Sequence, residues 1–209
     1  METSNKVAED LLKIKAVKFS LAPPFTWASG WQSPIYCDNR QTLSYPSIRA
    51  SLTQAFVAQV KEKYPQASGI AGVATGAIAL GILVAEELGL PFIYIRSKAK
   101  GHGMQNLIEG ALDPQGSYVV IEDLISTGMS STRAVKALQD SGATVLGTLA
   151  IFSYGFPQAQ AAFEATGTPF DTLTNMDALM EVAEKIDYLQ PGEKETIQRW
   201  QSQPDQWKG

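Results

Sequence analysis

Residues 118–132 of the chain read YVVIEDLISTGMSST, and this stretch decides the fold. Its first part, residues 118–121, is apolar and β-branched without polar alternation, which predicts a strand buried on both faces. Two carboxylates, Glu122 and Asp123, follow at the expected carboxyl end of that strand. A hydroxyl-rich turn then leads into an expected helix at residues 130–140, where apolar side chains recur at helical spacing.

This order of strand, acid pair, turn and helix predicts an anion site. Backbone N–H groups at a helix start lack partners within the helix, and the helix dipole favours an anion there. Gly128 permits a positive φ and a close approach of the backbone to a ligand. The carboxylates cannot bind a phosphate without a metal between, but they can accept hydrogen bonds from sugar hydroxyls, so the combination suits a sugar phosphate. A solvated acidic loop before an ordinary helix N-cap explains the same residues about as well.

Composition excludes several classes of function. The 209 residues carry a formal net charge of −4, which argues against a general nucleic-acid binder. Cys37 is the only cysteine and His102 the only histidine, so an internal disulfide and a structural zinc site are both excluded. The chain also lacks the glycine-lysine pattern of a P-loop, and no Gly-x-Gly-x-x-Gly follows a strand near its start.

No segment predicts a secretory leader or a membrane span. Residues 1–10 are rich in charge and lack the apolar run of a signal peptide. Residues 69–85 carry no charge, but this run is short for a span, is rich in Gly and Ala, and is followed by Glu86 and Glu87. We therefore predict a cytoplasmic protein with no membrane partner.

Strands and helices alternate along most of the chain. Expected strands lie at residues 35–37, 70–73, 91–95, 118–121, 145–152 and 170–173. Expected helices lie at residues 5–19, 46–63, 77–88, 130–140, 157–166 and in parts of 177–209. Alternation of this kind predicts a parallel sheet covered by helices on both faces, with ligands at the carboxyl ends of the strands. Trp200 and Trp207 are the expected packing anchors of the last helices.

Two further segments are candidates for chemistry. Residues 72–77, GVATGA, form a turn of small residues that is either a pyrophosphate cradle or simply a place where a helix packs closely on the sheet. Residues 96–103, RSKAKGHG, hold three cations and the histidine without any acid. This segment is either a solvated surface loop or a mobile arm whose cations stabilise a departing pyrophosphate.

Residues 119–132, VVIEDLISTGMSST, resemble the phosphoribosyl pyrophosphate signature of type I phosphoribosyltransferases, and the EDLISTG form is most similar to that of orotate phosphoribosyltransferases. The segments at 72–77 and 96–110 resemble the pyrophosphate turn and the flexible catalytic loop of the same family. Residues 25–40, FTWASGWQSPIYCDNR, resemble the hood that covers its substrate. The resemblance runs from about residue 25 to about residue 152, with a loosely similar helical tail.

The resemblance implies an α/β fold, with a parallel-sheet type I phosphoribosyltransferase core flanked by helices. A small hood is formed by the N-terminal and C-terminal segments. We expect a single domain over residues 1–209, with the hood at roughly 1–45 plus part of 175–209 and the core at roughly 46–174.

The implied activity is transfer of phosphoribosyl from 5-phosphoribosyl 1-pyrophosphate to orotate, giving orotidine 5′-monophosphate and pyrophosphate in the synthesis of UMP and other pyrimidine nucleotides. Mg²⁺ is the implied cofactor, held mostly by substrate and water rather than by protein ligands. A homodimer with shared active sites is the implied assembly. A phosphoribosyltransferase for another nucleobase shares the same motif, and a regulator that senses phosphoribosyl pyrophosphate is less favoured because the chain is acidic.

The same resemblance implies the roles of individual residues. The expected catalytic residues are Lys100, Arg96, His102 and Asp123. The expected contacts to phosphoribosyl pyrophosphate are Arg96, Lys100, His102, Glu122, Asp123, Leu124, Ile125, Ser126, Thr127, Gly128, Met129 and Ser130. Ser126 is also expected to contact orotate.

The chain departs from the family pattern at several positions. Ala28 and Ser97 stand where lysines occur in other members, and residues 153–155, Ser-Tyr-Gly, stand where some members hold the orotate carboxylate with an arginine. Met129 replaces a second glycine in the phosphate turn, so we expect it in an ordinary helical or extended conformation. Arg40 fits either a salt bridge or a substrate contact, and the aromatic residues near position 27 fit either a small core or a cover for the base.

Overall fold

The computed structural model describes residues 2–27, 29–98, 107–190 and 192–207. In this part of the chain a central sheet has the strand order β10 (Phe170–Asn175), β9 (Thr144–Ser153), β8 (Ser117–Ile125), β5 (Gly69–Val73), β6 (Phe92–Ile95) and β7 (Ile108–Glu109). Neighbouring strands run parallel except for β7, which pairs antiparallel with β6 at one edge. The predicted parallel sheet is therefore confirmed, with one short antiparallel strand that the polar segment 96–110 did not reveal.

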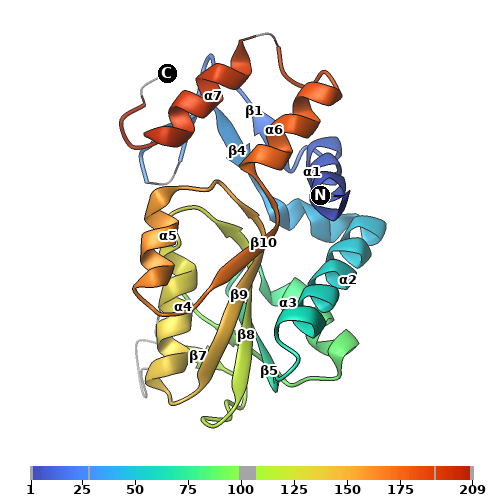
Figure 1. Cartoon of the computed structure of the whole chain (residues 1–209), viewed down its shortest axis with the longest axis vertical. Helices are drawn as coiled ribbons and strands as arrows, with labels where there is room; N and C mark the ends of the chain where they lie inside the picture. Colours follow the sequence, from blue (N-terminus) through green and yellow to red (C-terminus); the bar gives the residue numbers. More distant parts are fainter. Residues whose placement is uncertain (1, 28, 99–106, 191, 208–209) are drawn as a thin grey trace.

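Helices cover both faces of this sheet, as predicted (Figure 1). On one face lie α2 (Pro46–Lys63) and α3 (Ile78–Leu88), whose apolar side chains pack with Val119 and Ile121 of β8. On the other face lie α4 (Met129–Asp140) and α5 (Pro157–Glu164), which pack with Val120. Both faces of β8 are thus buried, which explains why its sequence lacks polar alternation.

The N-terminal and C-terminal segments lie together at one end of the molecule and form the hood (Figure 1). The hood contains α1 (Glu2–Lys13), β1 (Val17–Phe19), β4 (Ile35–Cys37), α6 (Met176–Lys185) and α7 (Glu193–Ser202). Two short segments complete it, a hairpin of β2 (Phe25–Thr26) with β3 (Gln32–Ser33) and a 3-10 helix, η1 (Asn39–Ser44). The predicted α/β fold with a two-ended hood is confirmed, whereas the proposed residue limits of hood and core stay a prediction.

The helix predicted for residues 5–19 is wrong in its second half. The helix α1 ends at Lys13, Lys15 has a positive φ of 57°, and Val17 begins a strand that pairs antiparallel with Cys37. Apolar side chains at helical spacing continue past the helix end because Ala16, in the bend after the helix, and Val17, at the start of β1, are also buried. Pairing with a strand about twenty residues away overrode the local pattern.

The hood holds an aromatic cluster made of Trp27, Trp31, Tyr154, Phe156 and Trp200. Trp200 is fully buried, and its ring lies 5.7 Å from Trp27, 5.6 Å from Tyr154 and 5.4 Å from Phe156 between centroids. Trp200 is therefore the predicted anchor of the last helix, and Trp207 packs partly buried against the same core. The position of Trp27 in this cluster supports the interpretation of the N-terminal aromatic residues as a small core.

The uncharged run at residues 69–85 does not form a membrane-spanning helix. Residues 69–85, which carry no charge, form β5, a turn and most of α3, as predicted. Among the helices of the described residues, none combines the length and the apolar character that crossing a membrane requires.

Replacement of Trp200 by alanine should destabilise the protein by about 3–5 kcal/mol, because it removes a fully buried indole from the aromatic cluster. Denaturant-induced unfolding would measure this change in the free energy of unfolding. The matched control is Ile186→Ala, since Ile186 is 43% exposed, and its cost should stay below about 1 kcal/mol. A Trp200→Ala variant as stable as the control would contradict the assigned role of the cluster.

Candidate active site

The turn between β8 and α4 has the geometry that the sequence predicted for an anion site. Gly128 is the N-cap of α4 with a φ of 79°, and its carbonyl accepts hydrogen bonds from the backbone N–H and the hydroxyl of Thr132 at 2.9 and 2.8 Å. Met129 is the first residue of the helix and is 72% exposed, so the expectation of an ordinary backbone conformation there is confirmed. The positive φ falls on the glycine, and the helix start remains open to a ligand.

The two acids have different environments, although both belong to β8, which continues to Ile125 rather than ending at residue 121. Glu122 is 3% exposed and accepts hydrogen bonds from the Asp123 backbone N–H at 3.0 Å and the Ser131 hydroxyl at 3.0 Å. The Ser130 hydroxyl donates to the same carboxylate at 3.3 Å. Burial raises the pKa of Glu122 well above its ordinary value, and the charge of Asp123 raises that pKa further.

Asp123 lies against the turn that follows β5. A methyl group placed on Gly76 would overlap the Asp123 carboxylate, so this position admits only glycine unless the acid moves. The parallel pairing of β5 with β8, in register from Gly69 with Tyr118 to Gly72 with Ile121, brings the two turns together. The small-residue turn at 72–77, a weak candidate from sequence, therefore adjoins the acid pair.

The hood contacts Asp123 through residues at the end of β4 and directly after it. The side-chain amide of Asn39, which is 1% exposed, donates to the backbone carbonyl of Asp123 at 2.6 Å. The Cys37 thiol donates to the Asn39 side-chain oxygen at 3.2 Å. Sequence reasoning missed Asn39 because an asparagine in a short turn-like run gives no sign of a contact with a distant strand.

A cavity of about 390 Å³ opens where these three segments meet. The residues that line it are Cys37, Asp38, Arg40, Val73, Ala74, Thr75, Gly76, Glu122, Asp123, Leu124 and Ser130. A second cavity of about 190 Å³ shares Val73, Ala74 and Ser130 with the first and adds Arg96, Met129 and Arg133. Both lie at the carboxyl ends of the parallel strands, where ligands of open α/β sheets bind.

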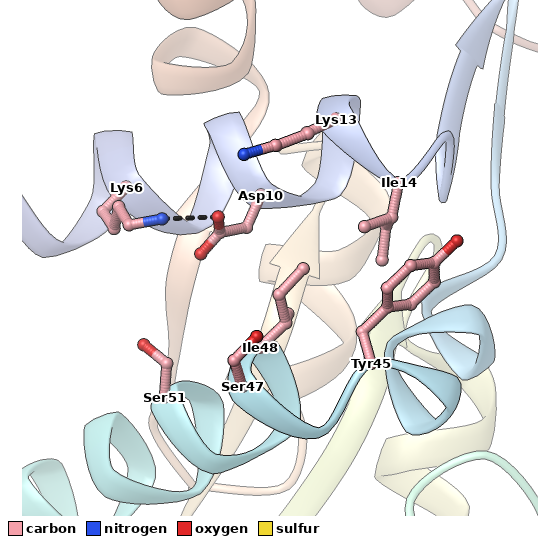
Figure 2. Close-up of a pocket in the computed structure, with 8 residues that line it drawn as sticks. All are labelled: Lys6, Asp10, Lys13, Ile14, Tyr45, Ser47, Ile48 and Ser51. Carbon is pink, nitrogen blue, oxygen red and sulfur yellow. Dashed lines mark hydrogen bonds and ion pairs between the residues drawn. The ribbon is translucent and has the colours of Figure 1, made fainter.

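A larger cavity, of about 560 Å³, lies elsewhere, between α1 and the start of α2 (Figure 2). It is lined by the ion pair of Lys6 with Asp10 and by Ser47 and Ser51 of α2, as Figure 2 shows. Its volume does not make it the active site, because neither the glycine turn nor the acids of β8 line it.

The basic segment is only partly described. Arg96 lies at the second cavity, pairs with Glu109 at 3.3 Å, and donates its backbone N–H to the Leu107 carbonyl at 2.8 Å. The predicted contacts Lys100 and His102 lie outside the described residues. Arg133 of α4 donates to the Ser97 carbonyl at 3.0 Å, a link between helix and segment that the sequence did not suggest.

Comparison with known proteins identifies the family, although no protein-family model matches the chain. The chain is 52% identical to the orotate phosphoribosyltransferase of Phocaeicola vulgatus, over 100% of this chain and 99% of that protein. It is 51% identical to the orotate phosphoribosyltransferase of Bacteroides fragilis, over 96% of this chain and 95% of that one. The chain belongs to the orotate phosphoribosyltransferase family. The crystal structure of orotate phosphoribosyltransferase from Aeropyrum pernix has a similar fold, with a TM-score of 0.76 and 26% identity over 88% of this chain and 99% of that one.

The expected substrate contacts of an orotate phosphoribosyltransferase occupy different positions in the site. Leu124 and Ser130 line the cavity of about 390 Å³ with the two acids, whereas Ser126 and Thr127 are half-buried in the turn before α4. Ile125 has a fully buried side chain in the core, so only its backbone is available for the predicted contact.

The departures from the family pattern have consequences at the hood. Ala28 lies outside the described residues. Tyr154 stands near the position where some family members have an arginine, but its side chain is 2% exposed and stacks on Phe156 with ring centroids 5.3 Å apart. Burial raises the pKa of the Tyr154 phenol well above its ordinary value. Residues 153–155 therefore supply no cation.

The protein groups in this site fit a magnesium ion that is held chiefly by substrate. No cluster of three or more His, Cys, Asp or Glu side chains that could hold a metal ion occurs among residues 2–27, 29–98, 107–190 and 192–207. Asp123 faces the cavity, whereas the Glu122 carboxylate already accepts three hydrogen bonds. Mg²⁺ commonly keeps several waters and binds through one or two carboxylates and substrate phosphates, which suits this donor set.

Replacement of Glu122 by glutamine should change how stability depends on pH. Because the folded-state pKa of Glu122 is raised, its contribution to stability is fully present below the unfolded-state pKa and is lost as the pH rises through the folded-state value. Glutamine is neutral throughout, so the stability of Glu122→Gln relative to the wild type should increase as the pH rises above the ordinary glutamate pKa of about 4.3.

Urea unfolding at a series of pH values would measure this effect. Glu181→Gln is the matched control, because Glu181 is an exposed glutamate on α6. Parallel stability curves for wild type and Glu122→Gln would show that the buried carboxyl is not raised in pKa.

Proposed function

We propose that this protein transfers the phosphoribosyl group of phosphoribosyl pyrophosphate to orotate and releases orotidine 5′-monophosphate and pyrophosphate. The observation that carries the proposal is the meeting of the Asp123 carboxylate, the open start of α4 and the Gly76 turn at one cavity. Membership of the orotate phosphoribosyltransferase family supports the choice of substrates.

The sugar phosphate binds at the start of α4. Backbone N–H groups of residues 126–130 bind the 5-phosphate, because a helix start presents unpaired donors and a favourable dipole to an anion. The glycine at position 128 lets this turn close around the ligand. The Asp123 carboxylate accepts hydrogen bonds from the ribose hydroxyls and stabilises the positive charge that develops on the ring.

Glu122 supports the contact between Asp123 and the ribose by linking β8 to α4. Its carboxyl binds the hydroxyls of Ser130 and Ser131 in the first turn of α4. It thereby holds the helix start against the strand that carries Asp123. The ribose contact predicted for Glu122 itself stays part of the proposal.

Bond exchange at the anomeric carbon needs charge control rather than a strong base. N1 of orotate bonds to C1 of the ribose and loses its proton to solvent, while the bond from C1 to the pyrophosphate oxygen breaks and the pyrophosphate keeps the electron pair. Arg96, Lys100 and His102 neutralise the departing group, which gains negative charge in the transition state. Bound Mg²⁺ would supply further neutralisation of the same oxygens.

A homodimer that shares its active sites completes the proposal, with Lys100 and His102 of one subunit serving its neighbour. The cytoplasmic location stays a prediction from sequence.

The direct test of the function is a base screen with the purified protein, phosphoribosyl pyrophosphate and Mg²⁺. Orotate absorbance should fall with time, and one pyrophosphate should appear for each orotate consumed. Uracil, hypoxanthine and adenine should show no comparable turnover. Faster use of any of these bases would assign the protein to a different nucleobase, and binding of phosphoribosyl pyrophosphate without turnover of any base would favour a sensing role.

Shared active sites predict complementation between inactive variants. Lys100→Ala and Asp123→Asn should each lower kcat by orders of magnitude. The first variant lacks a cation that neutralises the leaving group, and the second lacks the carboxylate that binds the ribose hydroxyls. Subunits of the two variants, mixed and allowed to exchange, should recover activity well above either variant alone, since some sites then combine both intact residues. If the mixture is no more active than the separate variants while subunit exchange is demonstrated, each subunit works with its own loop.

A further inference from the structure

Arg40 lines the cavity of about 390 Å³ that the two acids of β8 also line. Of the described residues that line this cavity, Arg40 alone carries a positive side chain, whereas Asp38, Glu122 and Asp123 are acidic. An anionic ligand that enters here therefore meets mainly carboxylates, and one guanidinium has to offset them.

The guanidinium of Arg40 is held by a bidentate ion pair. Its Nε donates to Asp38 Oδ1 at 2.6 Å and its Nη2 donates to Asp38 Oδ2 at 3.1 Å. Hydrogen bonding from Arg40 holds the pKa of Asp38 below its ordinary value, so Asp38 is ionised as its partner. A guanidinium has more N–H donors than this pair uses, and with the side chain 59% exposed the remaining donors are accessible.

The backbone that carries Arg40 is fixed to the catalytic strand. Asn39 precedes it and donates to the Asp123 carbonyl at 2.6 Å from an almost fully buried side chain. Asp38 also caps the 3-10 helix η1 by accepting the backbone N–H of Arg40. The guanidinium thus has a defined place relative to the Asp123 carboxylate, at the hood side of the cavity.

We infer that Arg40 binds the carboxylate of orotate and of orotidine 5′-monophosphate, and so selects an acidic pyrimidine over a neutral one. This inference rests on the proposed function. A planar guanidinium matches a carboxylate through paired hydrogen bonds, which gives geometric selectivity as well as charge. The pyrophosphate side of the site has other cations, since Arg96 and Arg133 line the second cavity, whereas Arg40 lies at the hood side of the cavity of about 390 Å³.

The experiment compares two nucleotides that differ only in this carboxylate. Orotidine 5′-monophosphate and UMP are titrated by calorimetry into the wild type, Arg40→Gln and Arg199→Gln, the last being a control at an exposed arginine of α7. The wild type and the control should prefer orotidine 5′-monophosphate. In Arg40→Gln its affinity should fall about tenfold or more, as expected for a hydrogen bond to a charged group, while the affinity for UMP stays within about twofold.

A double variant distinguishes loss of the attraction between Arg40 and the nucleotide carboxylate from repulsion of that carboxylate by an unpaired Asp38. Arg40→Gln leaves Asp38 unpaired, and that carboxylate could itself repel the nucleotide. In Asp38→Asn combined with Arg40→Gln this charge is gone, and the preference for orotidine 5′-monophosphate should still be absent. A preference that returns in the double variant would overturn the inference.

Other outcomes would overturn it as well. An Arg40→Gln protein that keeps the wild-type preference does not use Arg40 for the carboxylate, and equal weakening of both nucleotides indicates a structural role. Weaker binding of pyrophosphate with an unchanged preference assigns Arg40 to the leaving group. A wild type that neither prefers orotidine 5′-monophosphate nor turns over orotate would instead overturn the proposed function, which the base screen detects independently.

Discussion

The parallel pairing of β8 with β5 on one side and β9 on the other is the constraint on which the site depends. Parallel strands end at the same edge of a sheet, so the turn after β5 and the turn before α4 must open side by side. This adjacency places Gly76 against the carboxylate of Asp123. The hood then closes over the pair through the hydrogen bond from Asn39 to the Asp123 carbonyl. Two turns that are weak signals alone form one cavity because the sheet fixes their separation.

The two neighbouring acids of β8 differ in burial and in hydrogen bonding. Both acids line the same cavity, but Glu122 is buried, has a raised pKa and accepts hydrogen bonds from hydroxyls of α4, whereas Asp123 is only partly buried. Because the Glu122 carboxylate accepts hydrogen bonds from Ser130 and Ser131, it joins the end of β8 to the first turn of α4. This difference in environment follows from strand geometry, since successive side chains of β8 point to opposite faces of the sheet.

Much of the fold could be predicted because β8, β9 and their helices show strong local patterns. The uninterrupted apolar run at 118–121 required burial on both faces, and the glycine at 128 required the turn that the structure contains. Three features could not be predicted. Val17 pairs with Cys37 although its spacing continues a helix, β7 is too short to show alternation, and Asn39 acts on a residue 84 positions away. Each depends on contacts between distant parts of the chain, which local periodicity does not record.

The joining of both chain ends in the hood has a consequence for how the protein is made. Helix α1 packs against α6, and Phe19 contacts Tyr188 with ring centroids 5.9 Å apart. Translation delivers α6 and α7 after every strand of the central sheet, so the sheet can assemble on the ribosome before the hood has received Trp200. Until α7 emerges, the rings of Trp27, Tyr154 and Phe156 lack the indole that packs against them in the folded protein.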